Sequence, residues 1–239
     1  QKLRLTGGEP SLRHDLTDII ADATKIPNIK TIAMTSNGVL LDQKIKQWHA
    51  AGLNAINISV DSLNREHFHA ITGHDRLNTI MAGVEKALAL PSLNVKLNAV
   101  LLRHLNDEQL PLWLEFIRTR NISVRFIELM QTGDNLDYFK NHHIAANTLQ
   151  QQLMAMGWQL QTRAFEAGPA MEYKHSDYAG SIGIIAPYSK DFCVGCNRLR
   201  VTATGDLRLC LFGEFGINLR PLLQADSQQA ELIARIQTQ

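Results

Sequence analysis

Lys2-Leu-Arg-Leu-Thr6-Gly7-Gly8-Glu9-Pro10 predicts a short apolar strand that ends in a glycine turn. Four later segments have the same apolar character and also predict strands: residues 31–35, 55–61, 94–102 and 124–130. Segments with helical spacing of apolar residues lie between them, at residues 15–24, 42–51, 77–90 and 107–119. This alternation predicts an α/β protein with a parallel sheet or a TIM-type βα barrel. We expect its strands to be apolar throughout, because both faces of such a sheet are buried.

The strand and helix rhythm stops near Met130. A predicted helix at 147–156 is followed by short strand-like segments that Gly and Pro interrupt, at residues 158–165, 170–173, 180–185 and 199–202. We therefore predict two domains. Residues 1–130 form a partial, incomplete βα barrel, and residues 131–239 form a C-terminal α+β segment.

The only three cysteines of the chain lie in this C-terminal segment, at Cys193, Cys196 and Cys210. Two thiols in a Cys-x-x-Cys loop, with a third nearby, predict a metal or cluster site. Structural zinc needs four ligands, whereas a four-iron cluster held by three cysteines leaves one iron open. Spacing alone leaves zinc and an iron–sulfur cluster both open. A redox disulfide or buried, inert cysteines fit the clustering less well.

Polar residues follow each predicted strand, where parallel βα folds place their chemistry. They are Glu9 after the first strand, then Thr35, Asn37, Ser59, Asp61, Lys96, Asn98, Arg125 and Glu128. Each alone has a structural explanation, such as a turn or, for Asp61-Ser62, a helix N-cap. Five strand ends of this kind together predict a ligand site.

Two arginines follow the second cysteine, in Cys196-Asn-Arg198-Leu-Arg200. Guanidinium groups are suited to phosphate or carboxylate ligands. Residues two apart on a strand share a face, so Arg198 and Arg200 are expected to point at one ligand while Leu199 packs the other way.

Composition excludes several classes of protein. Lys and Arg number 24 against 23 Asp and Glu, a net charge of +1, so no basic field attracts nucleic acid. No stretch approaches the roughly 18 apolar residues of a membrane span. Clustered cysteines favour a reducing, cytoplasmic location. The chain has no initiator Met and begins within a predicted strand, from which we expect a fragment.

Five motifs together resemble one known family. They are Arg4-Leu-Thr-Gly-Gly-Glu9-Pro10, Thr35-Ser-Asn-Gly38, Asn57-Ile-Ser-Val-Asp61-Ser-Leu63, Arg125-Phe-Ile-Glu-Leu-Met130, and Asp191-Phe-Cys-x-x-Cys-Asn-Arg-Leu-Arg200 with Cys210. The first motif is similar to an element of radical S-adenosylmethionine (SAM) enzymes. The whole set resembles the GTP 3′,8-cyclases of molybdenum cofactor biosynthesis, over essentially the entire chain. The cysteine motif with Asn-Arg-Leu-Arg is the specific part.

The resemblance implies a lyase with a partial radical SAM barrel and a second cluster site in the C-terminal segment. In the family, a first iron–sulfur cluster cleaves SAM, and the resulting radical abstracts a hydrogen from the ribose of GTP. Ring closure onto C8 gives (8S)-3′,8-cyclo-7,8-dihydroguanosine 5′-triphosphate. The resemblance places a [4Fe-4S] cluster on Cys193, Cys196 and Cys210, where the open iron holds the purine.

Residue roles follow from the matching motifs. Gly8, Glu9, Ser59 and Met130 resemble SAM contacts, with Glu9 near the amino group of the methionine moiety. The residues that resemble GTP contacts are Arg4, Thr35, Lys96, Arg198 and Arg200. No P-loop motif is present to hold the triphosphate, so separate basic side chains are expected to do so.

One departure from the family concerns the first cluster. Its Cys-x3-Cys-x2-Cys motif does not occur in these 239 residues, and no cysteine precedes Cys193. We therefore expect the isolated chain to lack SAM cleavage activity, because the family cleaves SAM with this N-terminal cluster and an electron donor. The first barrel strand of the family also has no counterpart in these residues. Its absence would expose a sheet edge, which favours association with a partner, for example as a homodimer.

Two other functions are compatible with parts of this pattern. One is a nucleotide-binding module that zinc or a cluster stabilises without catalysis. The other is a different radical SAM enzyme with an auxiliary cluster, such as one that modifies peptides. Lys96 and the Asn-Arg-Leu-Arg run favour GTP over a peptide.

Overall fold

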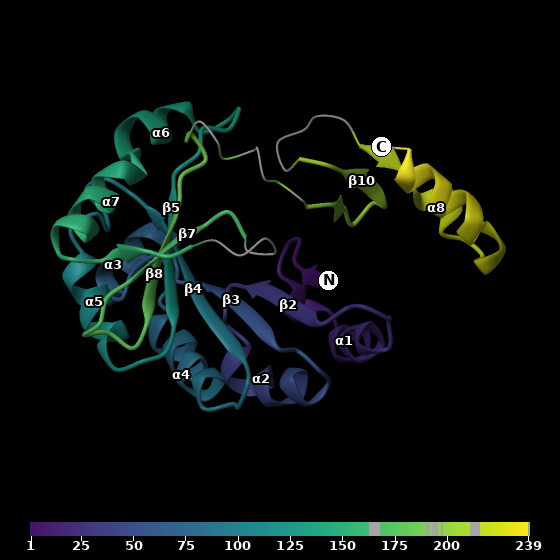
Figure 1. The fold of residues 1–239 in the computed structure, drawn as a ribbon, viewed down its shortest axis with the longest axis horizontal. Helices are drawn as coiled ribbons and strands as arrows, with labels where there is room; N and C mark the ends of the chain where they lie inside the picture. Colours follow the sequence, from purple (N-terminus) through teal and green to yellow (C-terminus); the bar gives the residue numbers. More distant parts are fainter. Residues whose placement is uncertain (163–167, 190–191, 193–195, 197, 211–215, 239) are drawn as a thin grey trace. The chain divides into compact units, whose positions relative to one another are not determined.

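The fold is described from a computed structural model of the chain, shown in Figure 1. The structure describes residues 1–162, 168–189, 192, 196, 198–210 and 216–238. The chain divides into two compact units, Gln1–Phe192 and Cys193–Gln239. The sequence-based division after residue 130 therefore falls inside the larger unit.

The larger unit is built on one sheet with the strand order β1-β2-β3-β4-β5-β8-β7-β6. Neighbours among the first six strands pair in parallel. These strands are β1 (Lys2–Leu5), β2 (Thr31–Ser36), β3 (Ala55–Ser59), β4 (Asn94–Leu101), β5 (Ser123–Glu128) and β8 (Ser181–Ile185). The antiparallel strands β7 (Met171–Lys174) and β6 (Gln159–Leu160) complete the sheet. All five strands predicted up to residue 130 are confirmed, and the segment predicted at 180–185 joins the same sheet beside β5.

Helices lie along the outside of the curved sheet of this unit (Figure 1). Those predicted from helical spacing form α1 (Leu16–Thr24), α2 (Leu41–Ala50), α4 (Leu77–Leu88), α5 (Leu110–Arg118) and α7 (Ala146–Ala155). The short helices η1 (Pro10–Leu12), α3 (Arg65–Thr72) and α6 (Leu136–His142) were not predicted. Phe68 is the one buried residue of α3, so this helix has little apolar periodicity. Both ends of α3 are nevertheless well marked. Asn64 caps its first turn, and Gly73, with φ 72°, ends the helix.

The helix-covered face of the sheet supplies the hydrophobic core, whereas the opposite face carries mostly polar residues, some of which, such as Asn57 and Arg125, are also buried. Residues along β4 alternate between buried and partly exposed. Leu97 and Ala99 are buried in the core, whereas Lys96 and Asn98 are partly exposed on the other face. Met34 of β2 and Ile56 of β3 contribute to the same core. The expectation that the strands are apolar throughout is therefore wrong. The opposite face is polar, so the strands follow the two-residue alternation of a sheet with one buried face.

The smaller unit contains an antiparallel sheet with the order β11-β10-β9. Its elements are β9 (Arg200–Val201), β10 (Asp206–Arg208), β11 (Ile217–Asn218), η2 (Arg220–Leu222), η3 (Asp226–Gln228) and α8 (Gln229–Gln237). Among its described residues, the buried hydrophobic side chains are Leu207 and Leu219. In the described parts of the chain, no helix has the length and apolar content that crossing a membrane requires.

Candidate functional site

Two rungs of side chains cross the polar face of the sheet at neighbouring levels. The first rung joins Thr35, Asn57, Lys96, Ser123 and Ser181 through the register of five adjacent strands. Because registered residues of neighbouring strands project to the same face, these five polar side chains form one continuous row. The sequence predicts two members of this rung, Thr35 and Lys96, as GTP contacts.

The second rung lies two residues further along each strand and therefore projects to the same face. It joins Ser59, Asn98, Arg125, Gly183 and Glu172. Asn98 Oδ1 is buried, and no donor among the described residues reaches it. A buried acceptor without a protein partner is unfavourable, so Asn98 Oδ1 needs a donor from water or a ligand.

Arg4 reaches the first rung from the edge strand β1. Its backbone pairs with Ala33, one level before Thr35. The side chain spans this difference, and Nη1 donates a hydrogen bond of 2.8 Å to Thr35 Oγ1. Two residues that the sequence assigns separately to GTP are therefore in direct contact.

Four cationic side chains share this face and influence one another. The pKa of Lys96 is lowered to about 8, mainly by burial and further by repulsion from Arg125, Lys2 and Arg4, while the Glu172 carboxylate acts in the opposite direction. Lys2 has a lowered pKa for similar reasons, namely burial followed by repulsion from Arg4 and Arg125. The face is thus more cationic than its own counter-charges balance, which is the property of a site for a polyanion.

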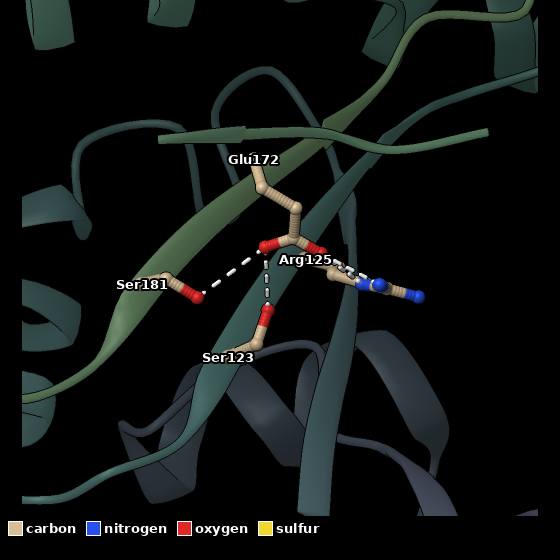
Figure 2. A network of polar contacts seen from close by, with 4 residues as sticks. All are labelled: Ser123, Arg125, Glu172 and Ser181. Carbon is tan, nitrogen blue, oxygen red and sulfur yellow. Dashed lines mark hydrogen bonds and ion pairs between the residues drawn. The ribbon is translucent and has the colours of Figure 1, made fainter. Parts of the chain in front are cut away.

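Glu172 makes the principal counter-charge contact in this cluster, as Figure 2 shows. Its Oε1 accepts hydrogen bonds of 3.0 and 2.6 Å from Arg125 Nε and Nη2. Its Oε2 accepts hydrogen bonds of 2.9 Å from Ser123 and 3.3 Å from Ser181. Burial alone would raise the pKa of Glu172, but Arg125, Lys96 and Ser123 outweigh it and lower the pKa.

The loop after β1 combines open space with a firmly held carboxylate. A Cβ added at Gly8 would meet no atom within 4 Å, so this glycine faces space in which a ligand can lie close to the backbone. Glu9 accepts hydrogen bonds from the Ser36 hydroxyl at 2.8 Å, from the Asn37 N–H at 2.7 Å and from the Ser11 N–H at 3.0 Å. Glu9 therefore connects the loops that follow β1 and β2, a structural role that the sequence did not reveal.

The end of β3 carries Ser59 exposed and Asp61 partly buried. Asp61 accepts a hydrogen bond of 2.8 Å from the Val100 N–H of β4. Burial raises the pKa of Asp61, and the Val100 hydrogen bond acts in the opposite direction. The N-cap explanation for Asp61-Ser62 is wrong, because the cap of α3 is Asn64.

The peptide bond that follows Met130 is held from both sides. Asn135 Nδ2 donates a hydrogen bond of 2.9 Å to the Met130 carbonyl, and the Gln131 N–H donates one of 2.7 Å to the Tyr188 hydroxyl. The Tyr188 ring also lies edge-on to His143, at 5.9 Å between centroids. The His143 ring nitrogen lies 2.8 Å from Glu128 Oε1, which anchors this arrangement to β5. These contacts restrict the backbone at Met130.

The cysteine site belongs to the smaller unit, and one of its members, Cys193, lies outside the described residues. Cys196 and Cys210 are both exposed free thiols. The antiparallel pairing of Arg208 with Arg200 lies two residues before Cys210 and two residues after Arg198. The hairpin of β9 and β10 therefore brings the chain before Cys210 back beside the strand that follows Arg198.

The two arginines after Cys196 lie beside the thiols. The backbone N–H and the guanidinium of Arg198 lower the pKa of the Cys196 thiol, against a smaller opposing effect of burial. Arg200 Nη1 donates a hydrogen bond of 3.3 Å to the carbonyl of Leu209, the residue before Cys210. Leu199 was expected to pack opposite the arginines, but its side chain is 60% exposed.

The structure therefore brings together Arg4, Thr35 and Lys96, with Ser59 on the neighbouring rung. Lys2 and Glu172 were missed by the sequence-based prediction. Lys2 could have been found, because Lys2-Leu-Arg4 already places two basic residues on one face of a strand. Glu172 could not, since β7 joins the face only through its pairing with β8.

Two family models cover almost the whole chain. Residues 1–117 match the radical SAM superfamily, and residues 122–239 match Molybdenum Cofactor Synthesis C. A GTP 3′,8-cyclase of Stenotrophomonas maltophilia strain K279a is 60% identical over 238 residues, which are 100% of this chain and 73% of the relative. A GTP 3′,8-cyclase of Yersinia pestis is 55% identical over the same share of each chain.

Solved structures support the fold. SuiB of Streptococcus suis bound to S-adenosylmethionine matches with a TM-score of 0.60 at 11% identity, over 97% of this chain and 54% of SuiB. A domain of a pyruvate-formate lyase-activating enzyme from Bacteroides vulgatus matches with a TM-score of 0.51 at 16% identity. This second match covers 65% of this chain and 92% of that domain.

Proposed function

This chain belongs to the GTP 3′,8-cyclase family of radical SAM enzymes, and on that premise we propose that its polar sheet face binds GTP and SAM. The reaction we assign is the family's conversion of GTP to its 3′,8-cyclised triphosphate in molybdenum cofactor biosynthesis. The cation cluster on the sheet is the observation that carries this proposal, because it is a site for a polyanion where no P-loop motif exists.

The triphosphate of GTP carries about four negative charges at neutral pH. We propose that Arg4, Thr35 and Lys96 bind it, and we add Lys2 and Arg125 from their place in the same cluster. The hydrogen bond from Arg4 to Thr35 supports a shared role, because it fixes the guanidinium beside the first rung before a ligand arrives. Separate forked donors of this kind suit phosphate oxygens.

For SAM we propose Gly8, Glu9, Ser59 and Met130 as contacts. Gly8 faces open space, and Ser59 is exposed at the end of β3. Glu9 already accepts three hydrogen bonds, but a carboxylate offers about four acceptor positions, so one position can still receive an ammonium group. SAM, when bound and reductively cleaved with electrons from a donor protein, supplies the radical chemistry of the family.

We propose that Cys193, Cys196 and Cys210 hold a [4Fe-4S] cluster. The described residues fit this group, since Cys196 is an exposed thiol and Arg198 favours its thiolate form. Such a cluster, when bound through three thiolates, supplies one open iron position to a purine. Arg198 and Arg200 would then contact GTP next to the cysteines.

The direct test is GTP binding, measured anaerobically by calorimetry against guanosine, which lacks the triphosphate. We expect the protein to bind GTP more tightly than guanosine. Lys96→Ala and the double variant Arg198→Ala/Arg200→Ala should each weaken GTP binding and leave guanosine binding unchanged. Lys44→Ala, which removes an exposed lysine of α2, is the matched control. Equal affinity of the parent protein for GTP and guanosine would contradict the triphosphate site.

A further inference from the structure

We propose that Glu172 is a positioning residue of the triphosphate site, which holds the Arg125 guanidinium across Gly183 and provides the counter-charge to Lys96. This inference rests on the proposed GTP site and assigns a role to a residue that no motif marks. Glu172 lies on the antiparallel strand β7, whereas Arg125 and Lys96 lie on the parallel strands β5 and β4.

The first argument is that the Glu172 carboxylate is fully engaged. Both oxygens accept two hydrogen bonds, from Arg125 on one side and from Ser123 and Ser181 on the other (Figure 2). The ion pair lies mostly out of water, since the Arg125 and Glu172 side chains are only 11% and 27% exposed. A carboxylate held in this way cannot turn away, so it fixes the plane of the guanidinium.

The second argument is the glycine between the two residues. Gly183 pairs with both Arg125 and Glu172 in the sheet, so it separates them on the second rung. A Cβ at Gly183 would lie 2.8 Å from Arg125 Cγ and 3.4 Å from Glu172 Cδ. Its φ is in the ordinary range, so the need for glycine comes from the space that the Arg125 side chain occupies.

The third argument is what remains unused on Arg125. Glu172 takes the donors of Nε and Nη2, and Nη1 has no hydrogen-bond partner among the described residues. Figure 2 shows the outer end of the guanidinium directed away from Glu172. A guanidinium anchored on one edge and open on the other is prepared for an anionic ligand, because its orientation no longer has to be selected on binding.

The fourth argument concerns Lys96. The charged groups that act on it are Arg125, Lys2 and Arg4, which lower its pKa, and Glu172, which raises it. Burial is the largest effect and also lowers the pKa, to about 8 in total. Glu172 therefore favours the charged form of Lys96 against three cations, two on β1 and the third the partner of Glu172 itself.

A simpler electrostatic role makes the opposite prediction. If Glu172 acted only as a negative charge near the ligand, it would repel the triphosphate, and its removal would strengthen GTP binding at every pH. If Glu172 positions Arg125 and keeps Lys96 protonated, its removal weakens GTP binding, and the loss grows with pH.

The experiment measures GTP and guanosine affinity of the full chain from pH 6.5 to 9.5 for the parent protein and the isosteric variant Glu172→Gln. The terminal phosphate loses its last proton near about pH 6, so the ligand's charge is nearly constant over most of this range. In the parent, GTP affinity should begin to fall as pH rises above about 8, because Lys96 in the protein without GTP then loses its proton. In Glu172→Gln, we expect GTP affinity about tenfold lower at pH 7.5 and a fall that begins at lower pH. Guanosine affinity should be the same in the two proteins at each pH.

Three further variants separate positioning from folding. Glu172→Asp keeps the charge on a shorter side chain, so the onset of the pH-dependent fall should match the parent while GTP affinity falls; this variant also serves if Glu172→Gln does not fold. Gly183→Ala displaces Arg125 and should weaken GTP binding with Glu172 intact. Glu115→Gln removes an exposed carboxylate paired with Arg118 and is the matched control.

The outcomes are distinct. If the parent binds GTP but Glu172→Gln binds it equally or more tightly with the same pH onset, the inference about Glu172 is overturned. If the pH onset is the same in the parent, Glu172→Gln and Glu172→Asp, the counter-charge role is overturned as well. If the parent itself does not distinguish GTP from guanosine, the proposed function fails before Glu172 is tested.

Discussion

Arg4 donates a hydrogen bond of 2.8 Å to the hydroxyl of Thr35, which joins the edge strand β1 to the first rung of the polar face. The hydroxyl therefore orients a cation, and it remains able to donate its own proton to a phosphate oxygen. Because Thr35 orients Arg4, substitutions of the two residues should lower GTP affinity by different amounts that do not simply add.

We expect Arg4→Ala to weaken GTP binding by about 1.5–3 kcal/mol, as charge-assisted hydrogen bonds to phosphate are lost. Thr35→Val should cost less, because Arg4 stays near the site without its orienting partner. In the double variant the two losses should not add, since Thr35 acts largely through Arg4. Calorimetry checks this, with Arg65→Ala, an exposed arginine paired with Asp75, as the control. Full additivity would show that the two side chains act independently.

Lys96→Met should stabilise the protein at pH 7 while it weakens GTP binding. The folded-state pKa of Lys96, about 8, lies below the ordinary lysine value of 10.5, so the folded protein releases this proton more readily than the unfolded chain. At pH 7 both states bind the proton, and folding carries the full cost of burying the charge. As pH rises from 8 towards 10.5, the parent should gain stability. The measurement is Tm against pH, where the advantage of Lys96→Met should shrink above pH 8. A constant difference would contradict the assignment.

Tyr188→Phe should weaken SAM binding several-fold and leave GTP binding unchanged. The substitution removes the acceptor of the Gln131 N–H and so releases one side of the peptide bond after Met130. The expected loss is about 1 kcal/mol, the usual net value of one hydrogen bond. Tyr178→Phe is a suitable control, because that hydroxyl makes only a long contact of 3.5 Å with Arg118. Unchanged SAM affinity in Tyr188→Phe would mean that Met130 does not need this support.

Anaerobic reconstitution should give a brown protein with about four iron atoms per chain. The prediction follows from the three cysteines of the sequence together with membership of the GTP 3′,8-cyclase family, because three thiolates leave one iron of a four-iron cluster open. Replacing any one cysteine by serine should abolish the absorption of the cluster. Iron and zinc analysis with visible spectroscopy tests this. A colourless protein with one tightly bound zinc would favour the zinc-stabilised nucleotide-binding module instead.

Loss of the metal should unfold the smaller unit before the larger one. Leu207 and Leu219 are the buried hydrophobic side chains among the described residues of the smaller unit, whereas the larger unit has an extensive core. Units of this size usually need a metal, a disulfide or a partner for stability. Calorimetry should therefore show two transitions in the metal-free protein, with the upper one little changed on reconstitution. A single transition in both states would contradict independent units.

The sequence predicts the larger unit well because buried strands and amphipathic helices follow local rules. Residues 31–35 and 124–130, for instance, form β2 and β5 within a residue or two of the predicted bounds. α3 was missed because one buried residue, Phe68, gives no periodicity to detect. The capping residues Asn64 and Gly73 were the available signal.

The candidate site is predictable only in part. Arg4, Thr35 and Lys96 were found from motifs, and the structure places them on neighbouring levels of one face. Glu172 could not be found, because β7 reaches this face only through its pairing with β8, and the side-chain contact with Arg125 spans 47 residues of sequence. The roles of Cys193, Arg198 and Arg200 stay predictions, since they depend on the binding of an iron–sulfur cluster and GTP.

The two-residue alternation of the sheet has a consequence for how this protein can vary in length. Lys96 and Asn98 face the site while Leu97 and Ala99 face the core, so deleting one residue before them in β4 would exchange the two sets. A lysine would enter the core and leucine would replace it in the site, which destroys folding and binding together. Insertions and deletions are therefore tolerable in the loops but not within the strands, and we expect natural length differences among relatives to be confined to the loops.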